Sequence, residues 1–84
     1  MTGPRPATTL DRLPAGHTAS VVAVGARHSI ELLREGIVEG ALLSVRGVAP
    51  LGGPVIVELG RATVAVARPI AATVRVSVEF EAGR

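Results

Sequence analysis

The segment Ala49-Pro50-Leu51-Gly52-Gly53-Pro54 lies between two valine-rich stretches and decides how the chain must fold. Its two prolines cannot donate to a sheet ladder, and its two glycines permit positive φ. The six residues therefore predict a tight reversal between two strands. Leu51 stands at the tip of this reversal, where burial alone does not account for a leucine. We expect its side chain to contact another molecule.

Valine-rich stretches on both sides of this segment predict the strands of a sheet. Five stretches have this character: Thr18–Val24, Leu42–Val48, Pro54–Leu59, Ala62–Ala67 and Val74–Val78. In the last of them Val74, Val76 and Val78 alternate with polar residues, so we expect these three valines to face inward. The short Gly60-Arg61 connection predicts a hairpin. So few strands bury their apolar faces efficiently only by curling, which predicts a mainly β fold, an antiparallel closed or partly open barrel of about five strands.

Residues Ser29–Glu35 predict the only helix of the chain. Ile30 and Leu33 lie three residues apart with Leu32 beside them, and we expect these apolar residues to form one side of the helix. Gly36 is well placed to end the helix in the left-handed conformation. The isoleucine after it is expected to pack back on the last turn.

Two short turns are expected to accompany the strands. Leu10 and Leu13 lie three apart before a proline, which predicts a short cap that covers one end of the core. Residues Pro69–Ala72, before the last strand, predict a short 3₁₀ turn.

The length of 84 residues is enough for one small domain. Residues 1–9 contain two prolines and no periodic pattern, so we expect a disordered tail there. The barrel domain is expected over residues 10–80, followed by a short tail over residues 81–84.

The composition excludes several classes of protein. There is no cysteine, hence no disulfide framework or thiolate metal site, and no apolar run is long enough for a signal peptide or a membrane span. We therefore expect a soluble, cytoplasmic protein. The nine arginines are spread evenly and only one aromatic residue is present, a pattern that disfavours nucleic-acid binding.

His28, Glu31 and Glu35 are the candidate metal ligands. They stand at i, i+3 and i+7, so all three project from one face of the predicted helix, and this mixture of donors suits ferrous iron or zinc. The alternative is a solvated helix face on which Arg27 and Arg34 pair with the two glutamates. We favour the alternative and expect at most weak binding of a divalent ion, with no resident cofactor, because three ligands on one helix lack groups that orient them.

Catalysis is not expected. Asp11 is the only aspartate and the chain has two histidines, so a nucleophile, base and orienting group have few ways to meet. Gly52-Gly53 is followed by proline rather than by a Lys-Ser/Thr pair and a helix, so the glycines form no phosphate cradle.

The order of these motifs closely resembles the FeoA domain family, over about Leu10 to Val78. The matching residues are Leu32, Gly36, Ile37 and Gly40, then Ala49–Pro54, then Gly60, Val64, Val66 and Arg68, and finally Ala71, Val74 and Val76. The resemblance implies a small SH3-like barrel associated with FeoB, a bacterial ferrous-iron permease with a cytosolic GTPase domain. It implies an accessory protein that acts by protein contact, for which we expect Pro50, Leu51, Gly52 and Gly53 to form the partner-binding loop.

Three positions depart from the family pattern. Glu31 stands where the family usually has arginine, Glu35 where it usually has leucine, and Gly53 where it usually has aspartate. If the helix face docks on a partner, the reversed charge at Glu31 argues against the orientation that the family usually adopts.

Alternative interpretations remain for both the function and the loop. The same barrel resembles the C-terminal domain of DtxR-type iron-dependent repressors, which implies a metal-sensing regulatory module as the second function, and a self-associating structural domain is the third. For Leu51, the alternative to a partner contact is a side chain that folds back and plugs one end of the barrel.

Overall fold

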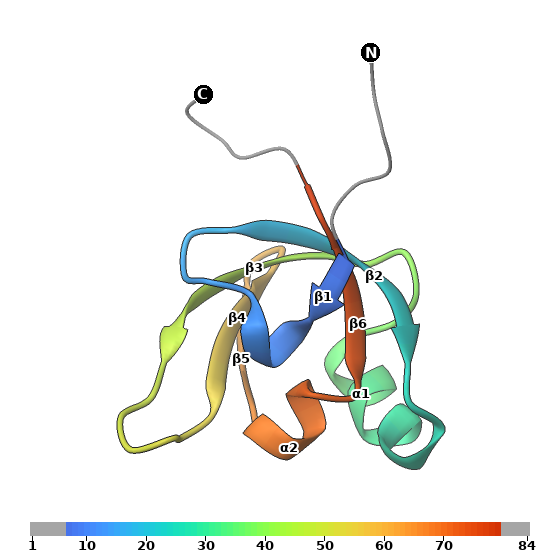
Figure 1. The fold of residues 1–84 in the computed structure, drawn as a ribbon. Helices are drawn as coiled ribbons and strands as arrows, with labels where there is room; N and C mark the ends of the chain where they lie inside the picture. The colour runs from blue at the N-terminus through green and yellow to red at the C-terminus, as the bar shows by residue number, and fades with distance from the viewer. Residues whose placement is uncertain (1–6, 80–84) are drawn as a thin grey trace.

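A computed structural model describes residues 7–79 as one antiparallel sheet with short helices beside it (Figure 1). The strands are β1 (Ala7–Thr9), β2 (Thr18–Val24), β3 (Leu42–Val48), β4 (Val55–Leu59), β5 (Ala62–Val66) and β6 (Val74–Val78). The helices are α1 (Ser29–Glu35) and α2 (Arg68–Ala71), and the 3₁₀ turns are η1 (Leu10–Arg12) and η2 (Ala26–His28). The fold is the predicted mainly β, SH3-like one.

The sheet is six-stranded, in the order β1-β6-β2-β3-β4-β5. Its two outer strands, β1 and β5, do not pair with each other, so the sheet curls without closing into a complete barrel. One extra residue interrupts the pairing of β2 between Val21 and Ala23 and the pairing of β3 between Val45 and Gly47. Such bulges bend a strand and increase its twist, which is how one short sheet wraps around its own core.

The sixth strand corrects the expectation of a disordered tail over residues 1–9. Residues Ala7–Thr9 form β1, which pairs antiparallel with β6 through Ala7 opposite Ser77 and Thr9 opposite Arg75. Three residues are too few to show an alternating pattern, so only the tertiary pairing reveals this strand. The remaining parts of the predicted tails, residues 1–6 and 80–84, lie outside the described residues.

The core is built almost wholly from aliphatic side chains. Its buried members are Leu10, Leu13, Ala19, Val21, Leu32, Ile37, Leu43, Val45, Val55, Val57, Val64, Val66, Ala71, Val74 and Val76. The two leucines around η1 cover one end of the core, as predicted. Val74 and Val76 face inward as predicted, whereas Val78, the last residue of β6, lies beyond the pairing of β6 with β1 and is only partly buried against the core.

Helix α1 ends in the way that the sequence predicts. Gly36 has φ of 90°, and its N–H donates to the carbonyl of Leu33 at 3.0 Å. The N–H of Ile37 donates to the carbonyl of Leu32 at 2.9 Å, which completes a Schellman motif. Leu32 and Ile37 are both buried, so this motif is also the apolar attachment of α1 to the sheet.

The predicted apolar side of α1 is wrong in one respect. Leu32 is buried, but Ile30 and Leu33 are 66% and 60% exposed. The Schellman motif fixes the rotation of the helix so that Leu32 points to the core, and residues two before and one after it then face away.

The second helix, α2, replaces the 3₁₀ turn predicted over Pro69–Ala72, so residues 7–79 contain two α-helices instead of one. The N–H of Ala71 donates to the carbonyl of Ala67 at 2.8 Å, which is the spacing of an α-helical turn. Pro69 lies in the first turn, where its missing N–H leaves no intrahelical bond unmade.

Truncation of Val76 tests the packing of this core. We expect Val76→Ala to lower the free energy of unfolding by about 1–3 kcal/mol, because it leaves a cavity in a core with no large residue to refill it. Chemical denaturation measures the change. Val22→Ala, at an exposed position of β2, is the control and should have little effect. Equal losses for the two variants would contradict the described core.

Candidate functional site

The loop between β3 and β4 is held by three backbone hydrogen bonds. The N–H of Ala49 donates to the carbonyl of Pro54 at 2.9 Å and closes the base of the loop. The N–H of Gly53 approaches the carbonyls of Ala49 and Pro50, each at 3.2 Å. These bonds and the two prolines fix the shape of the tip.

Leu51 projects fully into solvent from this tip, with a relative exposure of 105%. It is also the only residue other than glycine among residues 7–79 that has a positive φ, 62°, and the φ of Gly52 beside it is 70°. A leucine in the left-handed conformation costs about 1–2 kcal/mol. The alternative in which Leu51 folds back and plugs one end of the barrel is wrong. A strained, solvated leucine has no stabilising role within the described chain, and its role in partner binding stays a prediction.

Gly53 is required by its surroundings. A Cβ atom at this position would lie 2.8 Å from the Cβ of Ala49 and 3.1 Å from the carbonyl oxygen of Pro50. No side chain fits there unless the loop moves. The glycine that departs from the usual aspartate of the resembling family is thus matched to the compact form of this loop.

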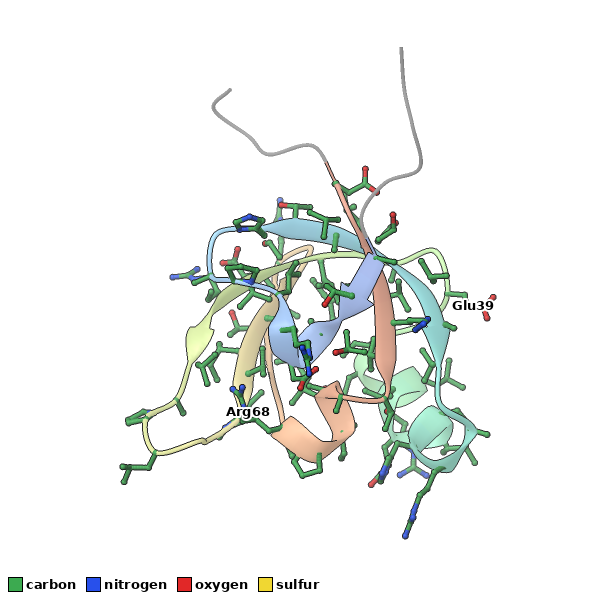
Figure 2. All side chains as sticks on the ribbon, in the orientation of Figure 1. Glu39 and Arg68 are labelled. Carbon is green, nitrogen blue, oxygen red and sulfur yellow. The ribbon has the colours of Figure 1, made fainter. Side chains whose placement is uncertain are left out.

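A second apolar surface lies beside α1. It is an open groove of about 300 Å³ with a mostly apolar lining. The apolar lining residues are Val24, Ile30, Leu33, Ile37 and Val38, and the polar ones are Ser29 and Glu39. Figure 2 shows Glu39 projecting outward from the connection between α1 and β3. Sequence reasoning missed this groove because it placed Ile30 and Leu33 toward the core.

The three candidate metal ligands are only partly brought together. The Nδ1 atom of His28 lies 2.7 Å from Oε1 of Glu31. Glu35, one turn further along α1, takes no part in this contact, and within residues 7–79 no three such side chains are grouped to hold a metal ion. The pairing of the two glutamates with Arg27 and Arg34 is not formed either; His28 is the partner that Glu31 uses instead.

Replacement of Leu51 by asparagine separates a structural role from an interface role. Asparagine tolerates positive φ better than leucine, so we expect Leu51→Asn to leave the melting temperature unchanged or slightly raised. Thermal denaturation followed by circular dichroism checks this. A marked fall in melting temperature would mean that Leu51 supports the fold.

Calorimetric titration with ferrous, manganous and zinc ions tests the metal site. We expect no saturable micromolar binding, because the ligands come from one short helix and nothing orients them. Saturable binding that disappears in the double variant Glu31→Gln/Glu35→Gln would overturn this expectation.

Comparison with known proteins places the chain in a family. The FeoA domain family matches residues 8–78. The chain belongs to the FeoA domain family. No curated protein matches it in sequence. Among residues 7–79, no helix is long and apolar enough to cross a membrane.

Two solved FeoA structures resemble the whole domain. A FeoA protein from Chlorobium tepidum is 32% identical with a TM-score of 0.79, covering 87% of this chain and 71% of that one. An iron uptake regulatory protein (FeoA) is 24% identical with a TM-score of 0.80, covering 88% of this chain and 99% of that one. The family and the fold predicted from the sequence are thereby confirmed.

The fold also occurs in a regulator of transcription. A manganese-dependent transcriptional repressor is 23% identical with a TM-score of 0.80, and the match covers 94% of this chain but 45% of the repressor. At this identity the likeness concerns the fold alone.

Proposed function

We propose that this FeoA-domain protein is an accessory protein of ferrous-iron transport that acts in the cytoplasm by contact with the cytosolic part of a FeoB-type membrane GTPase transporter. Membership of the FeoA family over residues 8–78 supports the transport role. The observation that carries the contact mechanism is Leu51, a fully exposed leucine held in a strained backbone conformation.

The loop is suited to binding because its backbone is already held in one conformation in the free protein. The hydrogen bonds of Ala49 and Gly53 and the two flanking prolines restrict the backbone in the free protein. A preformed loop loses little conformational entropy on association. An apolar side chain at the centre of a small interface contributes a large share of the binding energy when a pocket receives it.

Contact rather than catalysis is the proposed mode of action. Two polar contacts lie on the surface: His28 hydrogen-bonds to Glu31, and Arg46 forms an ion pair with Glu58. The hydroxyl of Ser29, next to His28 in the chain, donates to the carbonyl of Ala26 at 3.1 Å rather than to the imidazole.

A metal-sensing module is the second candidate function. The observations that favour it are the fold shared with a manganese-dependent repressor and the short contact between His28 and Glu31. The calorimetric titration described above decides this candidate without reference to the transporter.

Binding of the purified protein to the purified cytosolic region of a FeoB-type transporter tests the proposal. We expect measurable binding that falls by about fivefold to thirtyfold or more in Leu51→Asn, because truncation of an interface anchor costs roughly 1–2 kcal/mol or more. Leu42→Asn is the matched control, since Leu42 is also exposed, at 58%, but lies on β3. A stable Leu51→Asn protein that binds as well as the parent would refute the role of the loop.

A further inference from the structure

The free edge of β5 is a second surface that could receive another molecule. Strand β5 pairs with β4 on one side and forms the outer strand of the sheet on the other. Gly60 and Arg61 form a two-residue turn in which Leu59 stands opposite Ala62. This pairing makes Leu59 and Ala62 exchange hydrogen bonds, so in the antiparallel alternation the N–H and C=O groups of Thr63 and Ala65 point away from β4.

Nothing in the residues of β5 blocks this edge. The strand reads Ala62-Thr63-Val64-Ala65-Val66 and contains no charge and no proline. Natural proteins usually protect a sheet edge with a lysine, a proline, a bulge or a cover. The exposed side chains of Thr63 and Ala65 are small, so they add little bulk along this edge.

A small cleft separates β5 from α1. Its volume is about 120 Å³, and its lining residues are Glu31, Leu32, Glu35, Val64, Ala65, Val66, Ala67 and Ile70. The floor of the cleft is apolar. The volume of the cleft suits a single side chain rather than a whole small-molecule ligand.

The rim of this cleft is acidic. Glu31 and Glu35 are one helical turn apart, exposed, and on the same face of α1. His28 pairs with Glu31, and Glu35 has no ion pair within the described part of the chain. Two arginines flank β5. The guanidinium of Arg68 donates to the carbonyl oxygen of Asp11 at 3.4 Å, and Arg61 lies in the turn at the opposite end of the strand.

We propose that the β5 edge and α1 form a binding site for an extended, basic peptide segment. The segment adds as a strand along Thr63 and Ala65, which supply backbone hydrogen bonds. Its Lys or Arg side chains reach Glu31 and Glu35, and one apolar side chain enters the cleft. The acidic rim selects a basic strand over a neutral one, because it attracts positive and repels negative segments.

This site shares no residue with the Leu51 loop, so the inference does not rest on the proposed transport function. The transporter experiment and the peptide experiment can each fail alone. A protein that binds the transporter but no basic peptide would retain the first proposal and lose the second.

Fluorescence anisotropy with a short labelled peptide of alternating lysine and valine tests the inference on the full chain. We expect saturable binding that weakens with added salt, since exposed charges are screened. A peptide in which glutamate replaces each lysine should not bind. The double variant Glu31→Gln/Glu35→Gln should weaken binding by about tenfold, the combined effect of two exposed ion pairs. The matched control Glu39→Gln, at an exposed carboxylate away from β5, should change binding less than twofold or so.

The backbone part of the site is tested by Ala65→Pro. This change removes an N–H that points away from β4, so the sheet keeps its own pairing while the added strand loses a hydrogen bond. We expect weaker binding with a folded circular dichroism spectrum. If the proline variant does not fold, the glutamate variants alone decide. Three results would each overturn the proposal. They are equal binding of the acidic and basic peptides, unchanged binding in the glutamate variants, and a dimer in sedimentation that Ala65→Pro abolishes.

Discussion

The need to enclose an aliphatic core with one short sheet governs the rest of this structure. The described core contains valine, leucine, isoleucine and alanine and no aromatic side chain. Such residues are small, so the sheet must curve tightly to bring its own faces together. The bulges in β2 and β3 provide that curvature, and η1 closes one end with Leu10 and Leu13.

The same constraint leaves several parts of the molecule facing outward. A six-stranded sheet of this size curls without joining its edges, so β5 keeps an open side. Helix α1 is attached through Leu32 and the Schellman motif, which leaves Ile30 and Leu33 in solvent. The loop at Leu51 is fixed by prolines and hydrogen bonds rather than by burial. A small core therefore leaves apolar side chains and an outer strand at the surface.

The sequence predicts those elements that local chemistry determines. Strands Thr18–Val24 and Leu42–Val48 and helix Ser29–Glu35 have the predicted bounds, because alternation, glycine and the helix end are local signals. Features set by tertiary pairing were missed. Strand β1 has three residues and exists through its partner β6, and the rotation of α1 depends on where Leu32 meets the core.

The candidate site was predicted in part for the same reason. The Pro/Gly loop predicts an exposed Leu51, because the prolines and glycines of the loop determine the shape of its backbone. Helical spacing brings His28 next to Glu31, but the favoured pairing of the glutamates with Arg27 and Arg34 is absent. The cleft between β5 and α1 could not be predicted, since its two walls lie far apart in the sequence and meet only in the fold.

Leucine-methyl NMR spectra, recorded while the cytosolic region of a FeoB-type transporter is added, test the central claim most directly. The account predicts that the methyl signals of Leu51 shift or broaden on binding, whereas those of Leu42, which is also exposed but lies on β3, stay in place. A complex that forms with the Leu51 methyl signals unmoved would contradict it.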